Sequence, residues 1–306
     1  MNLRRHAWIV AAAAGAAAVW TLSASPPPAD KAAFEKEIAA WRADRDARLR
    51  SENGWLTLVG LFWLRPGENR FGTDRSNSMV LPPGSGPGFA GSFLLEGGKV
   101  RLRPQPEAGI TVNGAAPKGD EIKSDADGTA DEIRSGRIRL TLIRRGERLG
   151  IRAKDPESRV RTAFRGIESF PASPAWRIDA RFEPYDPPRE IEIPTVLGRA
   201  EKMRVPGVAR FTVGGNDVSL EPVLESADAK ELFFIFRDAT SGSVTYDAGR
   251  FLYADLPKDG RVILDFNRAY NPPCAFTRWA TCPLPPRTNW LPIRIEAGEK
   301  KYGAHP

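Results

Sequence analysis

The amino-acid sequence predicts a mainly β protein in which one N-terminal helix precedes two antiparallel β units. Three observations carry this prediction. From Trp55 onward, apolar and polar residues alternate in short runs of strand length. Turn dipeptides such as Asn113-Gly114 and Asp259-Gly260 separate these runs. The chain also contains 28 Gly and 27 Pro among its 306 residues, and this abundance favours many turns over long helices.

The N-terminal segment has the pattern of an export signal. Arg4 and Arg5 form a basic start, the run Trp8 to Leu22 is apolar, and small residues follow it before a triple proline. We therefore expect a signal peptide over residues 1–25 and an extracytoplasmic protein, either periplasmic or secreted. An uncleaved signal is the alternative, and it is the only membrane contact that we expect.

Residues 26–54 are expected to form a Pro-rich linker and one helix. The helix is predicted from Asp30, which can cap it, to Arg50, because apolar residues recur there at helical spacing. Asn53-Gly54 ends it. The apolar face consists of Phe34, Ile38, Trp41 and Leu49, and we expect this face to pack in the core.

The first β unit, predicted over residues 55–182, resembles a forkhead-associated domain. The resemblance rests on "NRFGTDRSNSMVLPPGS" (69–85), "GSFLLEGGKVRLRP" (91–104) and "GITVNGAAPKGDEI" (109–122). It implies a β-sandwich. However, Thr73 stands where the phosphate-binding Arg of that family belongs, and residues 86–89 supply no His. We therefore expect no phosphothreonine peptide as a partner.

The second β unit is predicted over residues 183–302. "EPYDPPR" (183–189) marks a boundary or crossover between the units, because its double proline interrupts a regular strand pattern. "LFFIF" (232–236) is apolar throughout, which predicts a central strand that is buried on both faces. Another strand is predicted over 291–296.

Histidine content excludes several catalytic machineries. The only two histidines are His6, inside the predicted signal, and His305, next to the last residue. A Ser-His-Asp triad, a Cys-His pair or a His-ligated zinc therefore has no histidine in the mature core. We expect no metal and no cofactor, and no phosphate-binding Walker loop is present in the sequence.

The net charge of +7 is a second constraint on partners. The arginines are spread singly through the predicted strands and do not cluster, so we interpret them as solvated strand faces and expect no nucleic acid as a partner. These arginines include Arg134, Arg137, Arg139, Arg144, Arg145 and Arg148.

Cys274 and Cys282 lie eight residues apart in a proline-rich stretch. In an exported protein, this spacing predicts a disulfide that braces the loop. The alternative is a reactive thiol, whose pKa Arg278 or a helix N-terminus would have to lower because no histidine is adjacent.

The remaining candidate site is a set of polar residues in the second unit. It comprises Asp238, Arg250, Asp265, Asn267, Arg268, Tyr270 and Asn271. As a catalytic set, Asp238 or Asp265 would be the base, Arg250 or Arg268 an anion clamp, and Tyr246 or Tyr270 the acid. The structural alternative is that these residues hydrogen-bond to strand ends and loops.

The chain resembles the bacterial domain-of-unknown-function family 1684 over residues 32 to 302. The resemblance is carried by the stretches at 50–72, 183–198, 232–257 and 264–300, the last of which includes "LDFNRAYNPPCAFTRWATCPLPP". The activity of this family is unestablished, so the resemblance implies no catalytic residues. Two functions follow as hypotheses: a non-catalytic module that binds a small anionic or carbohydrate-like ligand or a partner protein, and a His-independent hydrolase or lyase that uses residues 238–250 and 265–271.

Overall fold

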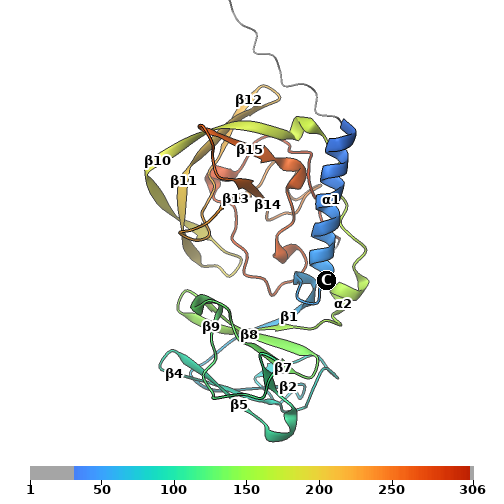
Figure 1. The fold of residues 1–306 in the computed structure, drawn as a ribbon, viewed down its shortest axis with the longest axis vertical. Coiled ribbons are helices and arrows are strands. Elements are labelled where there is room, and N and C mark those ends of the chain that lie inside the picture. The colour runs from blue at the N-terminus through green and yellow to red at the C-terminus, as the bar shows by residue number, and fades with distance from the viewer. Residues whose placement is uncertain (1–30, 304–306) are drawn as a thin grey trace, which may run out of the picture.

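The computed structural model describes residues 31–303, and Figure 1 shows their arrangement. The predicted signal peptide, the capping residue Asp30 and both histidines lie outside the described residues. Within the described part of the chain, no helix is long and apolar enough to cross a membrane. The mainly β fold with one long N-terminal helix is confirmed.

Helix α1 (Lys31–Arg50) forms because apolar residues recur on one face and ion pairs line the other. Phe34, Ile38 and Leu49 are buried. The exposed side carries ion pairs one turn apart, including Lys31 with Glu35. The helix runs along the second β unit and ends against the first (Figure 1). Trp41, predicted to lie in the core, is half-buried.

The first β unit is a pair of stacked sheets (Figure 1). Their facing sides hold a core that includes Phe71, Phe93, Leu140 and Ile151. One sheet has the order β1-β9-β8-β7-β6 and the other β3-β2-β4-β5. The strands are β1 (Leu58–Trp63), β2 (Gly67–Gly72), β3 (Met79–Val80), β4 (Gly91–Glu96), β5 (Lys99–Pro104), β6 (Thr111–Val112), β7 (Glu132–Ser135), β8 (Ile138–Arg145) and β9 (Arg148–Lys154).

The outer face of strands β8 and β9 turns toward the second unit. Successive side chains of a strand point to opposite faces, so the apolar residues of β9 fill the sandwich core while Arg152 and Lys154 lie on the other side. Ile143 of β8 is 1% exposed although it is not part of the sandwich core. This face is therefore covered by protein.

The second β unit contains a four-stranded antiparallel sheet and a two-stranded one. The first has the order β12-β11-β10-β15, and the second pairs β13 with β14. The elements from α2 onward are α2 (Arg159–Ala163), β10 (Arg177–Pro194), β11 (Ala200–Val213), β12 (Asn216–Leu220), β13 (Glu231–Phe236), β14 (Arg250–Asp255) and β15 (Arg261–Asp265). Strand β13 contains "LFFIF", and all five of its residues are buried.

Two parts of the second unit differ from the sequence prediction. Strand β10 runs through the double proline at 187–188, and its register against β11 shifts between Pro184 and Arg189. Proline has no N–H to donate to the ladder, and the shift accommodates it. Residues 291–296 do not form a strand; their backbone instead hydrogen-bonds to buried side chains of the second unit.

The predicted disulfide is wrong. Cys274 and Cys282 are free and buried. The backbone N–H of Cys274 donates a hydrogen bond to Sγ of Cys282 at 3.2 Å, and the hydroxyl of Tyr246 donates to the carbonyl of Cys274 at 3.0 Å. Packing and these hydrogen bonds hold the loop. The prediction failed because the sequence separation of two cysteines and the expected compartment of the protein do not determine how the two thiols are oriented.

Candidate functional site

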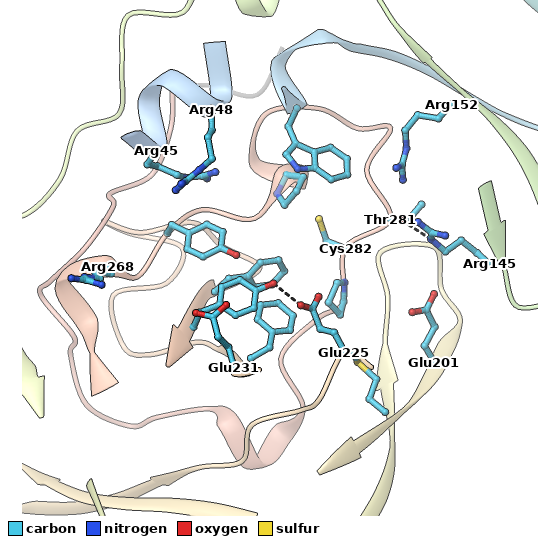
Figure 2. Close-up of a pocket in the computed structure, with 18 of the residues that line it drawn as sticks. Arg45, Arg48, Arg145, Arg152, Glu201, Glu225, Glu231, Arg268, Thr281 and Cys282 are labelled. Carbon is cyan, nitrogen blue, oxygen red and sulfur yellow. Dashed lines mark hydrogen bonds between the residues drawn. The ribbon is translucent and has the colours of Figure 1, made fainter. Parts of the chain in front are cut away.

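A cavity of about 850 Å³ lies between helix α1, the outer face of β8 and β9, and the strands β13 and β14 (Figure 2). Its volume falls within the range of small-molecule sites, roughly 300–1,000 Å³. Both β units and the helix contribute side chains to it. The lining residues are Trp41, Arg45, Arg48, Trp55, Arg145, Arg152, Glu201, Met203, Glu225, Glu231, Phe233, Phe251, Tyr253, Arg268, Tyr270, Pro273, Thr281, Cys282 and Pro283.

The lining carries more positive than negative charge. Five of these residues are arginines and three are glutamates, so the formal balance is +2. Figure 2 shows the arginines in two groups, with Arg145 and Arg152 on one side and Arg45, Arg48 and Arg268 on the other.

Most of these arginines already have an acidic partner. Nε of Arg45 lies 3.1 Å from Oε1 of Glu299, and its Nη2 donates to the carbonyl of Asn271 at 2.9 Å. Arg48 pairs with Asp44, and Arg268 pairs with Glu37. Their charges are largely compensated, so they shape the cavity more than they attract an anion.

Glu299 holds Arg45 in place through an ion pair. Its carboxylate also accepts a hydrogen bond from the N–H of Asn271 at 2.6 Å. Burial raises the pKa of Glu299, while Arg45 and the Asn271 N–H act in the opposite direction. Gly298 precedes it at a φ of +76°, and a Cβ there would lie 2.3 Å from the carbonyl oxygen of Ala269. Only glycine lets the chain approach that closely.

Arg152 is the exception among the cavity arginines. Its Nε and Nη2 atoms are buried and have no hydrogen-bond partner among the described residues. Its guanidinium carbon lies 5.1 Å from the centre of the Trp55 ring. Burial, followed by repulsion from Arg145, lowers the pKa of Arg152 to about 10. The side chain therefore remains charged at neutral pH and forms no ion pair with any residue of 31–303, although the Asp125 carboxylate acts to raise its pKa.

Arg145 stands next to Arg152 and is paired with a carboxylate. Its Nη1 lies 2.8 Å from Oδ2 of Asp125, and its Nε is 3.4 Å from the hydroxyl of Thr281. Both arginines come from the outer face of the first unit, whereas Thr281 belongs to the second. The cationic side of the cavity is thus built at the junction of the two units.

A cluster of four aromatic side chains lines the cavity, and we call it the aromatic wall. It consists of Phe233, Phe251, Tyr253 and Tyr270. Phe233 and Tyr253 are cross-strand partners whose ring centres are 4.8 Å apart, and the rings are nearly parallel at 23°. Tyr270 continues this arrangement, with its ring 6.3 Å from that of Tyr253 and inclined by 14°. Tyr253 is 36% exposed, so part of its ring is open to the cavity.

Two of the seven sequence candidates line this cavity, namely Arg268 and Tyr270. Burial raises the pKa of the Tyr270 hydroxyl, whereas Arg45, whose guanidinium carbon lies 4.6 Å from the centre of the Tyr270 ring, acts to lower it. The tyrosine is therefore neutral at physiological pH.

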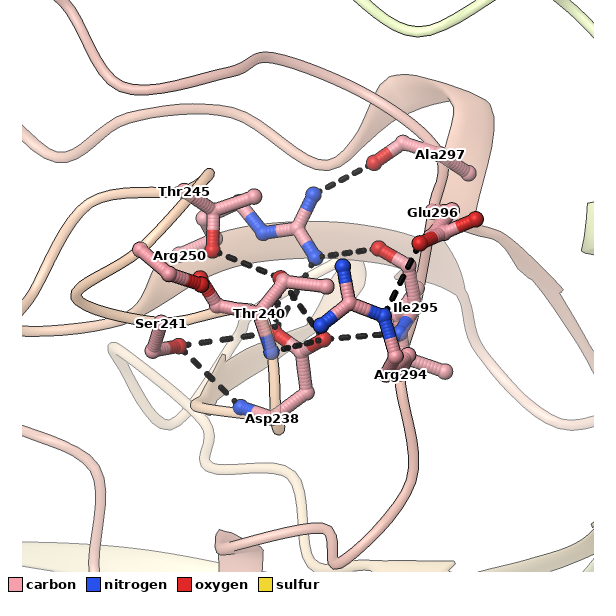
Figure 3. Close-up of polar contacts among 10 residues, drawn as sticks. Asp238, Thr240, Ser241, Thr245, Arg250, Arg294, Ile295, Glu296 and Ala297 are labelled. Carbon is pink, nitrogen blue, oxygen red and sulfur yellow. Dashed lines mark hydrogen bonds and ion pairs between the residues drawn. The ribbon is translucent and has the colours of Figure 1, made fainter.

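Asp238, in the loop after β13, and Arg250, at the start of β14, form a buried ion pair apart from the cavity lining (Figure 3). The Asp238 carboxylate accepts hydrogen bonds from the N–H of Ile295 at 2.7 Å and from the hydroxyl of Thr240 at 2.8 Å. The Arg250 guanidinium donates to the carbonyls of Ile295 and Ala297. Both side chains are fully buried, and these contacts tie the segment 293–297 to β14.

Asp265, Asn267 and Asn271 are likewise engaged in structural contacts. The Asp265 carboxylate pairs with Arg177, at 2.7 Å from its Nη2. Asn267 forms two hydrogen bonds to the backbone of Ser173, both at 2.9 Å. Asn271 donates its amide to the carbonyl of Lys300 at 2.8 Å. The seven candidates therefore do not share one cleft.

Sequence reasoning missed Arg152 and Arg145 as site residues, and it found only Tyr270 among the four residues of the aromatic wall. The alternation in β9 placed Arg152 off the sandwich core, but that pattern does not distinguish a face covered by water from one covered by another unit. Among the described residues, no three His, Cys, Asp or Glu side chains lie close enough together to hold a metal ion.

Comparison with known proteins places part of the chain in a family. Residues 162–300 match the family described as "Protein of unknown function (DUF1684)". That span includes the stretches at 183–198, 232–257 and 264–300 but not the one at 50–72. A solution NMR structure of an uncharacterized protein from Haloarcula marismortui is 33% identical over 47% of this chain and 80% of that one, with a TM-score of 0.40. No curated protein matches the chain.

Proposed function

We propose that this chain, which belongs to the DUF1684 family through residues 162–300, is a non-catalytic module that binds a small organic anion in the cavity between its two β units. The observation that carries the proposal is Arg152. Two of its three guanidinium nitrogens are buried without a hydrogen-bond partner among the described residues, which is costly, and an oxyanion is a ligand that compensates them with charge-assisted hydrogen bonds. Arg145 stands beside it and reinforces the positive potential.

The surroundings of Arg152 support a ligand site and not a purely structural cation. The structural cations of this protein, such as Arg250, donate to carbonyls and to a carboxylate. Arg152 has no such contact among residues 31–303, and it lines a cavity of about 850 Å³. A convergent polar group in a partly apolar cavity is the usual arrangement of a small-molecule site.

The His-independent hydrolase or lyase is less well supported. Its proposed bases, Asp238 and Asp265, are held by arginines and backbone N–H groups and do not line the cavity. Tyr270 does line it, but burial raises its pKa, which makes it a poor proton donor at neutral pH.

The forkhead-associated resemblance of the first unit stays a prediction, and we propose that this unit acts as a wall of the cavity. Thr73, which stands where that family has its phosphate-binding arginine, donates its hydroxyl toward the carbonyl of Pro87 at 3.2 Å. This contact supports a structural role for the loop. The predicted signal would place the cavity outside the cytoplasm, and N-terminal sequencing of the mature protein tests that expectation.

The test is a calorimetric titration of the full mature protein with inorganic phosphate, benzoate and phenyl phosphate at low ionic strength. Arg152→Ala is compared with Arg148→Ala as a matched control. Arg148 is on the same strand, but its guanidinium carbon lies 4.0 Å from the centre of the Trp63 ring, and its side chain does not line the cavity. Loss of a charge-assisted contact is worth about 1.5–3 kcal/mol, so Arg152→Ala is expected to weaken binding by about 10- to 150-fold.

Two results would overturn the proposal. One is that none of the three anions binds in a saturable manner to the wild-type protein. The other is that an anion binds but Arg152→Ala and Arg148→Ala weaken it equally, because the site would then lie elsewhere.

A further inference from the structure

We infer that the ligand of this cavity is a planar, ring-bearing organic acid, whose oxyanion contacts Arg152 and whose ring packs against the aromatic wall. The inference rests on the proposed function, because it specifies the ligand of the same cavity. It is carried by three observations: the size of the cavity, the geometry of the wall and the position of the arginine without an ion pair.

The size of the cavity argues for more than an inorganic ion. A volume of about 850 Å³ is suited to a small organic molecule, and a bare phosphate or sulfate would leave most of it filled with water. Apolar and aromatic side chains would then remain hydrated, which forgoes the free energy gained by covering them.

The geometry of the aromatic wall argues for a ligand with a flat ring. Phe233, Tyr253 and Tyr270 have nearly parallel rings, inclined by 23° and 14° between successive neighbours. Phe251 supports them edge-on, at 81° to Phe233. Aromatic rings prefer offset-stacked or edge-to-face contacts. Tyr253 is stacked against both Phe233 and Tyr270, so the exposed part of its ring offers an edge-to-face contact to a ligand.

The cavity arginine without an ion pair lies at one side of the cavity, and the three glutamates of the lining also form no ion pair among the described residues. Arg152 is without a hydrogen-bond partner among the described residues and comes from the first β unit, whereas the aromatic wall comes from the second. Across the cavity, Arg45, Arg48 and Arg268 are neutralised by carboxylates. A ligand that satisfies both sides therefore has an acidic group at one end and an apolar ring at the other.

The acidic group can be a carboxylate or a phosphate, since both form paired hydrogen bonds with a guanidinium. Three glutamates also line the cavity, and Glu225 accepts a hydrogen bond from the Tyr253 hydroxyl at 2.7 Å. These acceptors disfavour a second anionic group near the ring, so we expect a ligand with a single acidic group.

The experiment compares matched probes by calorimetry on the full mature protein. Benzoate is paired with acetate, and phenyl phosphate with inorganic phosphate, so that the ring is the main difference within each pair. Cyclohexanecarboxylate has the same charge and a similar apolar size as benzoate but is not flat. We expect each ring-bearing probe to bind at least about tenfold more tightly than its ring-less partner, and benzoate about 2- to 12-fold more tightly than cyclohexanecarboxylate.

Variants of Tyr253 test whether the ring of the ligand binds at the aromatic wall. Tyr253→Ala is expected to reduce the preference for benzoate over acetate by about 2- to 12-fold, and Tyr253→Phe, which keeps the ring, is expected to restore it. Trp290→Ala is the control, because Trp290 is 39% exposed and lies outside the cavity. The relative affinities of benzoate and phenyl phosphate identify the preferred acidic group.

The outcomes separate this inference from the proposed function. If phosphate and acetate bind through Arg152 but the ring adds nothing, the inference is wrong and the proposed function stands. Equal affinity for benzoate and cyclohexanecarboxylate would refute only the claim that the ring of the ligand is planar. If no anion binds in a way that depends on Arg152, the proposed function fails, and the inference fails with it.

Discussion

Arg250 and Asp238 form an ion pair that is fully buried, with Nη2 of the arginine 3.2 Å from Oδ1 of the aspartate and both side chains 0% exposed. The pair joins β14 to the loop after β13, and it receives the backbone N–H of Ile295 from a third segment. It holds together parts of the chain that are far apart in sequence.

Removing one member of this pair should destabilise the protein strongly. Asp238→Ala leaves the Arg250 charge buried and uncompensated, and breaking such a pair costs about 3–5 kcal/mol. Asp179→Ala is the control, since its ion pair with Arg261 is half exposed and should contribute about 1 kcal/mol or less. Urea unfolding measures both. A loss for Asp238→Ala that is no larger than for Asp179→Ala would contradict the structural role.

Arg152 should have the opposite effect on stability. Because its buried nitrogens have no hydrogen-bond partner among the described residues, Arg152→Met is expected to stabilise the ligand-free protein by about 1–2 kcal/mol while it weakens anion binding. Arg148→Met, at a half-buried neighbour on the same strand, should give no such gain. The free energy of unfolding, measured without ligand, checks this. A wild-type protein that is more stable than Arg152→Met would show that the guanidinium is already well compensated.

Glu299 should make stability depend on pH. Burial raises its pKa above the ordinary value of 4.5, so the folded protein binds this proton more tightly than the unfolded chain does. Its contribution to the free energy of unfolding therefore declines as the pH rises from about 4.5 through the raised value.

Glu299→Gln removes this ionisation, so the variant should gain stability relative to wild type as the pH is raised from about 4 to about 8. Unfolding curves at several pH values provide the measurement. A relative stability that falls with rising pH would mean that the Arg45 contact outweighs burial, which is the reverse of the expectation.

The two cysteines should titrate as free thiols. Contact with the Cys274 side chain, and then burial, raise the pKa of the Cys282 thiol, and the two residues are only 7% and 5% exposed. The native protein should therefore react slowly with a thiol reagent, whereas the protein unfolded without reductant should yield two thiols per chain. Cys282→Ala should yield one. A protein that releases thiols only after reduction would contradict the structure.

Much of the fold could be predicted because local periodicity determines it. The helical spacing of Phe34, Ile38 and Leu49 predicted α1, and the alternation of apolar and polar residues from Trp55 onward predicted short strands. The apolar run of β13 predicted its burial. Each of these patterns describes one segment and the face that it buries, so it can be read without knowledge of the neighbouring segments.

The site could be predicted only in part. Tyr270 and Arg268 are polar groups near a strand end, and they do line the cavity. Asp238 and Arg250 fit the same sequence pattern, but they face each other in the interior. Residue type and spacing do not distinguish these pairs, because a polar residue near a strand end can point either into a cavity or into the protein.

The sequence by itself determined the class of the fold, the positions of most strands and the lack of a histidine in the described core. The tertiary structure alone decided that the β8–β9 face is covered by the second unit, that two nitrogens of Arg152 are buried there without a hydrogen-bond partner among residues 31–303, and that the two thiols lie in contact without forming a disulfide. The physical reason is that burial, charge compensation and thiol geometry depend on which segments pack together although they are distant in sequence. No local sequence pattern determines that packing.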